Sequence, residues 1–133
     1  ISKKMSFSKI AAIESRGFIF AAVLSFLTNR PLVLLRKKGK LPGKTHSQKF
    51  KLEYGFDILE IHKSSLKKND KVLIIDDLIA TGGTALAGAK LVEKAKAKVS
   101  GFIFLINLFD LPGNNKLKSK GYKTFSLIKF PGH

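Results

Sequence analysis

The chain has 133 residues and no cysteine, and 25 Lys and Arg against 9 Asp and Glu give it a formal net charge of +16. Its 44% hydrophobic residues are enough for one buried core, which excludes a chain that is disordered throughout. The lack of cysteine excludes disulfides, Cys-ligated zinc and a thiol nucleophile, and it suits a reducing cytoplasm. Apolar stretches such as Phe18–Leu24 are far shorter than the ~20 residues of a membrane-spanning helix. We therefore expect a soluble, cytoplasmic protein with a single domain over residues 1–133.

Most of the positive charge comes from lysine, since only Arg16, Arg30 and Arg36 are arginines. Surfaces that read bases or clamp phosphates favour arginine, because its planar fork binds bidentately. Lysines scattered over nearly every segment are typical of a solvated surface. We therefore attribute the charge mainly to solvation, then to an anionic small-molecule substrate, and we disfavour nucleic acid as a partner.

The first third of the chain predicts a strand, a helix and a second strand. Ile10–Ile13 predicts a short buried strand. Phe18–Thr28 is apolar on nearly all sides and predicts a buried helix that Asn29 and Pro31 end. Leu32–Leu35 is a continuous β-compatible run, which is typical of a parallel sheet covered on both faces.

The middle of the chain changes character. Arg36–Gln48 is polar, basic and interrupted by Gly and Pro, so it predicts a long exposed loop. Lys49–Tyr54 and Phe56–Ile61 predict two strands of a hairpin joined near Gly55. Lys63–Asn69 is a polar connector. We expect the whole stretch from 36 to 62 to project from the main sheet as a hood.

The last part of the chain alternates strand and helix. Val72–Ile75 predicts a central strand that ends at Asp76 and Asp77, and Thr84–Lys98 predicts a helix with one apolar side. A further strand, a short helical segment and a final strand are predicted at Val99–Leu105, Gly113–Lys120 and Lys123–Ile128. This alternation predicts an α/β fold with an open, mostly parallel sheet flanked by helices.

The strongest chemical signal is the segment from Asp76 to Thr84, which joins the central strand to the next helix. Ligands in open α/β sheets bind at the carboxyl ends of strands. Gly82 and Gly83 allow a tight turn with inward N–H groups, and the start of the helix adds its positive dipole, so the segment predicts a phosphate cradle. Two carboxylates beside an anion suit the hydroxyls of a sugar. A 5-phosphorylated ribose satisfies both halves.

Each half of this signal has an ordinary interpretation when it stands alone. A Gly-Gly pair before a helix is commonly a simple turn, and an Asp pair after a strand can cap a helix or bind a metal. Their ordered combination at one strand end is much more specific. Other nucleotide motifs fail on spacing, because Gly83-x4-Gly88 is followed by Ala89 where a P-loop needs lysine, and there is no G-x-G-x-x-G.

The segment Asp76–Thr84 resembles the phosphoribosyl-pyrophosphate (PRPP) motif of the type I phosphoribosyltransferases. Further segments along almost the whole chain resemble the adenine phosphoribosyltransferases in their bacterial form: Glu14–Phe18, Arg36–Gly43, Leu52–Gly55, Leu59–His62 and Phe130–His133. The resemblance implies the type I phosphoribosyltransferase fold and the conversion of adenine and PRPP into AMP and pyrophosphate, with Mg²⁺ held mainly through PRPP or pyrophosphate. It also implies a homodimer. We expect no metal site made of protein side chains alone.

The resemblance also assigns roles to individual residues. Asp76 and Asp77 would hold the ribose hydroxyls and favour an oxocarbenium-like transition state. The 5′-phosphate would be bound by Ala80, Thr81, Gly82, Gly83 and Thr84. The pyrophosphate would be bound by basic residues, namely Arg16, Arg36, Lys37 and Lys40. Glu53 would be the general acid/base toward a ring nitrogen of adenine, with Tyr54 beside it. Without the resemblance, Glu53 would be an ordinary surface carboxylate.

Two other functions fit the same residues. A phosphoribosyltransferase for another base would keep the PRPP motif, and a regulator with this fold could bind PRPP or RNA without catalysis. Glu53 and Tyr54 favour an enzyme, and with the terminal Phe-Pro-Gly-His they favour adenine. The family carries several dozen residues before the first core strand, including a segment that helps enclose adenine, and the 133 residues hold no counterpart of it. A fragment of a longer protein and a shortened relative with weaker base recognition are both consistent with this.

Overall fold

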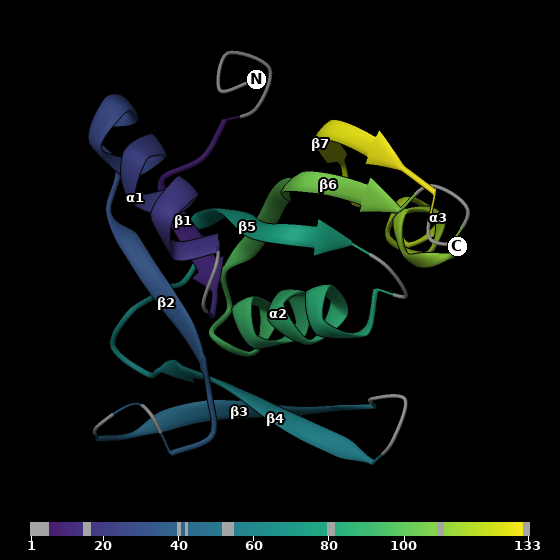
Figure 1. The fold of residues 1–133 in the computed structure, drawn as a ribbon. Helices are drawn as coiled ribbons and strands as arrows, with labels where there is room; N and C mark the ends of the chain where they lie inside the picture. The colour runs from purple at the N-terminus through teal and green to yellow at the C-terminus, as the bar shows by residue number, and fades with distance from the viewer. Residues whose placement is uncertain are drawn as a thin grey trace.

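A computed structural model describes residues 6–14, 17–39, 41, 43–51, 55–79, 82–108 and 111–131 of the chain. Within these residues lie one seven-stranded sheet and three helices (Figure 1). The strands are β1 (Lys9–Ile13), β2 (Leu32–Lys37), β3 (Thr45–Lys51), β4 (Phe56–His62), β5 (Lys71–Ile79), β6 (Lys98–Leu108) and β7 (Thr124–Phe130). The helices are α1 (Gly17–Thr28), α2 (Gly83–Lys94) and α3 (Gly113–Ser119). The predicted α/β class is confirmed.

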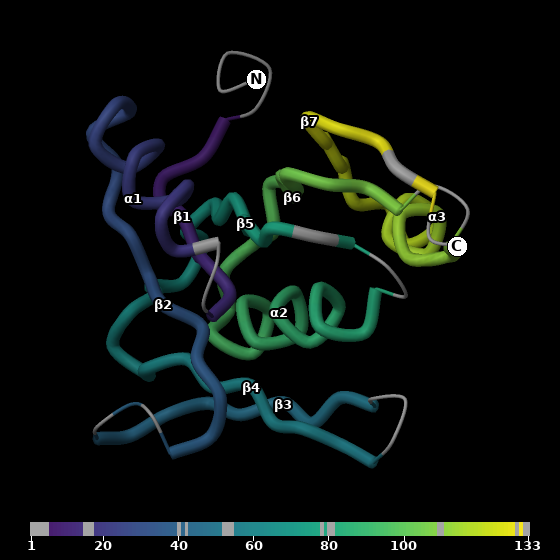
Figure 2. The backbone as a smooth tube through the Cα atoms, in the orientation of Figure 1, coloured from purple at the N-terminus to yellow at the C-terminus, as the bar shows by residue number. Residues whose placement is uncertain are grey.

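The sheet has the strand order β3-β4-β2-β1-β5-β6-β7. Neighbouring strands are parallel in the part β2-β1-β5-β6-β7. Strand β4 is antiparallel to both of its neighbours, β2 and β3. Strand β1 therefore lies beside β5, although everything from α1 to β4 comes between them along the chain (Figure 2). The hairpin of β3 and β4 extends from the parallel part and lies against α2, as Figure 1 shows.

Alternating side chains of the central strands form two cores, one on each face of the sheet. On β1, Ala11 and Ile13 belong to the core that includes α2, and Ile10 and Ala12 belong to the core that includes α1. Both faces of the central strands are therefore covered. This explains why their sequences are continuous apolar runs instead of alternating patterns.

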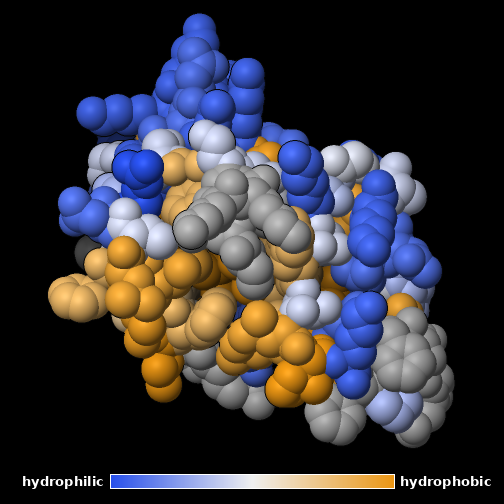
Figure 3. Space-filling view, turned by 90° about the horizontal axis from the view of Figure 1, so that it is seen from above, coloured by the Kyte–Doolittle hydropathy of each residue, from blue (hydrophilic) through white to orange (hydrophobic). Residues whose placement is uncertain are grey.

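Helix α1 differs from the sequence-based expectation, because it is not buried. Four of its large apolar side chains are more than half exposed, namely Ile19, Val23, Phe26 and Leu27. Their spacing places them on one face of the helix, opposite the face that packs on the sheet. The view in Figure 3 shows hydrophobic residues gathered into a broad patch on this side of the molecule.

Among the described residues, no helix has both the length and the apolar composition needed to cross a bilayer.

Three predicted boundaries were also wrong. The loop predicted at 36–48 is shorter, because β2 continues through Arg36 and Lys37 and β3 already begins at Thr45. The carboxylates of Asp76 and Asp77 do not follow the central strand but lie inside β5, which continues to Ile79. Helix α2 ends at Lys94 instead of Lys98. Its end is set by Lys96, which adopts the left-handed conformation (φ 65°) that usually requires glycine.

Candidate active site

The carboxyl ends of the parallel strands gather polar side chains at one edge of the sheet. Glu14 follows β1, Arg36 and Lys37 end β2, and Asp76 and Asp77 lie near the end of β5. Strands β2, β1 and β5 are consecutive neighbours in the sheet. At the carboxyl ends of the strands, the fold thus places the cations of β2 on one side of β1 and the two carboxylates of β5 on its other side.

The start of α2 has the geometry predicted for an anion cradle. Gly82 is the N-cap residue and has a left-handed backbone (φ 89°). No side chain of the described residues caps the helix by a hydrogen bond, and its first turn, which contains Gly83 and Thr84, has no acidic residue. The first N–H groups of a helix have no partner inside it and carry the positive end of its dipole. An anion such as a phosphate is the partner that this helix start suits best.

The two carboxylates lie just before this cradle in the chain and are both half-buried. One oxygen of Asp76 (Oδ1) accepts a hydrogen bond from the backbone N–H of Asp77 at 2.8 Å. This bond restricts the orientation of the Asp76 side chain. A fixed pair of carboxylates next to a phosphate cradle is suited to bind a phosphorylated sugar.

The cations at the end of β2 are held by acidic side chains. Nε of Arg36 lies 3.2 Å from Oε1 of Glu14, and its guanidinium carbon lies 5.9 Å from the centre of the Phe18 ring. Nζ of Lys37 lies 3.7 Å from Oδ2 of Asp57. The role of these cations in binding pyrophosphate stays a prediction, and the sequence gave no sign of the carboxylates that orient them.

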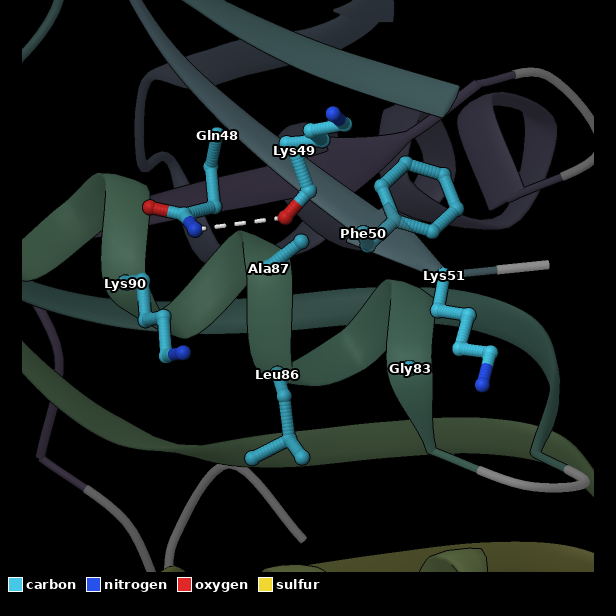
Figure 4. A pocket seen from close by; sticks show the side chains of 8 residues that line it. All are labelled: Gln48, Lys49, Phe50, Lys51, Gly83, Leu86, Ala87 and Lys90. Atoms are coloured by element: carbon cyan, nitrogen blue, oxygen red, sulfur yellow. Dashed lines mark hydrogen bonds between the residues drawn. The ribbon is translucent and has the colours of Figure 1, made fainter. Parts of the chain in front are cut away.

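An open groove of about 230 Å³ separates β3 from the first turns of α2. Its lining combines an apolar floor with three lysines, Lys49, Lys51 and Lys90. Figure 4 shows Lys51 extending past Gly83 at the start of α2. A Cβ atom on Gly83 would stand 3.4 Å from the carbonyl oxygen of Lys51, so the hairpin and the cradle are in contact. The groove therefore adds positive charge beside the anion cradle.

His46 on β3 contributes no charge to this basic region near neutral pH. Its partial burial lowers its pKa below the usual 6.5, and the positive charges of Lys63 and Lys94 lower the pKa further. A neutral imidazole does not attract pyrophosphate as a cation would. This agrees with leaving His46 out of the predicted site.

Part of the predicted site lies outside the described residues, namely Arg16, Lys40, Glu53, Tyr54, Ala80 and Thr81. Their roles stay predictions. The predicted site residues that the structure describes lie near the carboxyl ends of β2 and β5 and at the start of α2. They are Arg36, Lys37, Asp76, Asp77, Gly82, Gly83 and Thr84. In the described part of the chain, no group of three or more His, Asp or Glu side chains could hold a metal ion.

Three polar residues near the site were missed by the sequence reasoning. Glu14 accepts a hydrogen bond from the backbone of Lys37 at the end of β2, and Glu60 accepts one from the backbone of Gly39 in the segment that follows β2. Asn107 on β6 is buried, with 4% exposure, and its Oδ1 has no hydrogen-bond partner in the described structure. It pairs in register with Ile79, the last residue of β5. The sequence offered one signal for Asn107, because it is a polar residue near the end of an otherwise apolar stretch.

Comparisons with known proteins agree with this site. A family model described as the phosphoribosyl transferase domain matches residues 3–132. The adenine phosphoribosyltransferase of Pelagibacter ubique (strain HTCC1062) is 59% identical over 132 residues, which cover 99% of this chain and 75% of the relative. That of Prosthecochloris aestuarii is 48% identical over 128 residues, covering 96% of this chain and 72% of the relative.

Solved structures give the same result. The crystal structure of adenine phosphoribosyltransferase from Thermoanaerobacter pseudethanolicus is similar with a TM-score of 0.90 and 49% identity, over 95% of this chain and 72% of that chain. The enzyme from Saccharomyces cerevisiae, in complex with an imino-altritol bisphosphate and adenine, has a TM-score of 0.87 and 37% identity, over 94% and 69%. Because the family model spans nearly the whole chain and the relatives are up to 59% identical to it, the chain belongs to the phosphoribosyltransferase family, in the group of the adenine phosphoribosyltransferases.

Proposed function

We propose that this chain transfers the 5-phosphoribosyl group of PRPP to adenine, giving AMP and pyrophosphate. The observation that carries the proposal is the start of α2, which has no side-chain cap among the described residues and comes shortly after the two carboxylates of β5 in the chain. Relatives named for this reaction are up to 59% identical to the chain. In the reaction, the bond between C1 of the ribose and pyrophosphate oxygen breaks, and a bond from C1 to a ring nitrogen of adenine forms.

The phosphate and ribose bind at the end of β5. The backbone N–H groups at Gly83 and Thr84, with Gly82 forming the turn, receive the 5′-phosphate. Asp76 and Asp77 accept hydrogen bonds from the ribose hydroxyls. As pyrophosphate leaves, positive charge develops on the ribose ring, and two nearby carboxylates stabilise that charge more than they stabilise the ground state.

The pyrophosphate binds toward β2. Arg36 and Lys37 are the described cations on that side, and Arg16 and Lys40 would join them by resemblance. The donor set fits Mg²⁺, which is usually held by one or two carboxylates together with substrate phosphates and water. When bound, the ion would neutralise charge on the leaving pyrophosphate. Among the described residues near the cradle, the carboxylates of Asp76 and Asp77 are of the type that binds Mg²⁺.

Adenine binding rests on the resemblance. Glu53 and Tyr54 come after Leu52, the residue next to Lys51 of β3, and the backbone of Lys51 lies close to Gly83 at the start of α2. Glu53 would hold or release the proton of the reacting adenine nitrogen as the bond to C1 forms. The relative from Saccharomyces cerevisiae, which is 37% identical to this chain, has a crystal structure in complex with adenine.

The test is the formation of AMP from PRPP with adenine, compared with guanine, hypoxanthine and xanthine. We expect AMP with adenine in the presence of Mg²⁺ and little product with the other bases. We also expect calorimetry to show AMP and PRPP binding to the folded chain. Product from another base alone would contradict the adenine assignment, and binding without any product would favour the non-catalytic alternative.

We also infer that two copies of the chain associate through α1. Its exposed stripe consists of Ile19, Val23, Phe26 and Leu27, and the 12 residues of the helix include no charged side chain. Monomeric proteins rarely expose such a continuous apolar face. In a chain of net charge +16, an uncharged face is the surface through which two copies approach with the least repulsion. A symmetric contact of α1 with its own copy follows.

Replacing Ile19 and Phe26 together with glutamate should convert the dimer to a monomer. The two changes would place like charges opposite each other across the two-fold axis, which strongly disfavours association. Light scattering at micromolar concentration should give about twice 14.7 kDa for the wild type and about 14.7 kDa for the variant. The control Leu127→Glu changes an equally apolar exposed residue on β7 and should leave the dimer intact. A monomeric wild type would contradict the inference.

A cytoplasmic location is part of the same proposal. PRPP carries several negative charges, and charged groups enter the apolar interior of a membrane only at high cost. The enzyme must therefore meet PRPP in the compartment where PRPP is made. A chain without cysteine is compatible with a reducing compartment.

A further inference from the structure

The short segment that joins β2 to β3 is fastened at both ends by one carboxylate. Glu60 lies on β4, and β4 lies between β2 and β3 in the sheet. Oε1 of Glu60 accepts a hydrogen bond from the backbone N–H of Gly39 at 3.0 Å, and Oε2 accepts one from Oγ1 of Thr45 at 3.1 Å. The side chain of Glu60 thus spans from the start of the segment to its end.

A second carboxylate holds the strand that leads into this segment. Oε1 of Glu14 accepts hydrogen bonds from Nε of Arg36 at 3.2 Å and from the backbone N–H of Lys37 at 3.0 Å. Glu14 comes from β1, on the other side of β2 from β4. Acidic side chains therefore lie on both sides of the basic end of β2, where the segment begins.

The composition of the segment shows why it needs such fastening. Residues 36–44 contain five basic side chains and no acidic one. Like charges at this density repel one another and favour an extended chain. Gly39 and Gly43 add conformational freedom, and both have positive φ angles, of 85° and 79°. Without a fastening carboxylate, the segment would sample many arrangements and would have to be ordered each time it binds an anion.

We propose that Glu60 is a positioning residue, which fixes the basic segment 36–44 in the arrangement that receives pyrophosphate and touches no substrate itself. This rests on the proposed function, in which that segment lies on the pyrophosphate side. Within the described part of the chain, the hydrogen bonds of the Glu60 side chain go to Gly39 and Thr45, which both lie on the pyrophosphate side. The residue therefore controls the binding of PRPP and pyrophosphate and leaves the binding of adenine unchanged.

Three variants separate geometry from charge. Glu60→Ala removes both hydrogen bonds, and Thr45→Val removes one and keeps the carboxylate. Glu60→Gln keeps a carbonyl oxygen for the N–H of Gly39, while its amide can donate to the hydroxyl oxygen of Thr45, so it removes the charge and retains both contacts. The matched control is Glu93→Ala, which removes an exposed carboxylate that only accepts a hydrogen bond from Tyr122, far from the segment.

We expect Glu60→Ala to raise KM for PRPP about tenfold, the range for losing hydrogen bonds to a charged group, with kcat and KM for adenine within about twofold. Thr45→Val should have a smaller effect of the same kind. Glu60→Gln should stay near the wild type, and Glu93→Ala should match it. A merely structural role would lower the active fraction, and therefore kcat, with KM for PRPP unchanged; that result would overturn the proposal.

Two measurements keep this inference separate from the proposed reaction. Calorimetry should show that Glu60→Ala binds pyrophosphate more weakly than the wild type, whether or not AMP is formed. Hydrogen exchange of peptides covering 38–44 should be faster in the unliganded Glu60→Ala protein and unchanged in Glu93→Ala. Wild-type pyrophosphate affinity together with unchanged exchange in Glu60→Ala would disprove the positioning role. A wild type that makes no AMP would disprove only the reaction.

Discussion

Replacing Asp76 and Asp77 together with asparagine should lower the turnover of AMP formation by about a hundredfold or more, the usual size for losing an electrostatic interaction specific to the transition state. Asparagine keeps the size of each side chain and an oxygen that can still accept the hydrogen bond from the N–H of Asp77. It removes the negative charge that stabilises the cationic ribose. Binding of AMP, which carries no such cation, should stay within about tenfold.

The measurement compares steady-state turnover with AMP affinity from calorimetry, on variant and wild type that melt at similar temperatures. If the two aspartates served only the turn before α2, the double change would lower stability by about 1 kcal/mol and leave turnover of the folded protein nearly intact. Turnover close to that of the wild type would therefore reject the catalytic assignment. The two single variants show whether one carboxylate carries most of the effect.

The second large effect should come from Gly82→Ala, which we expect to destabilise the fold by about 1–3 kcal/mol and to weaken AMP binding at least about tenfold. Gly82 has φ 89°, a conformation that an L-residue adopts only under strain. An added Cβ atom would also stand 3.1 Å from Cα and 3.3 Å from O of Gly113. Since Gly113 presents backbone, this tight contact has to be relieved by a backbone shift of Gly113 or of the cradle.

The control for this prediction is Gly121→Ala. Gly121 has nearly the same backbone angle, φ 90°, but nothing lies within 4 Å of an added Cβ atom. The control therefore carries the conformational cost without the collision, and it should lower stability slightly and leave AMP binding unchanged. Urea unfolding and calorimetry measure the two quantities. Equal AMP affinity in Gly82→Ala and in the wild type would show that the cradle does not depend on this close contact.

Local signals explain what the sequence predicted well. The tight turn at Gly82 and the start of α2 could be predicted, because the glycine pair and the following amphipathic helix act within a few residues. The strands could be predicted from apolar runs bounded by turn residues. The early end of α2 could not, because its last turn is followed by good helix formers, and Lys96 adopts a left-handed conformation without being glycine.

Features that depend on distant contacts escaped the sequence. The exposed face of α1 has the composition of a buried helix, and only the folded structure shows that one face packs on the sheet while the other faces solvent. The roles of Glu14 and Glu60 depend on partners 15 to 23 residues away in the chain. Nothing in the local sequence distinguishes such a carboxylate from one on an ordinary surface.

The contact between Gly82 and Gly113 also links the phosphate cradle to the far edge of the sheet. Gly113 begins α3, and the next residue, Asn114, accepts a hydrogen bond through Oδ1 from Oγ1 of Thr124 at 2.7 Å. Thr124 is the first residue of β7, the outermost strand. The close approach of Gly82 to Gly113 and this hydrogen bond thus connect the cradle with that strand, and Figure 1 shows α3 lying next to β7. Spectroscopic probes on β7, well away from any ligand atom, are therefore suitable reporters of whether the cradle is filled.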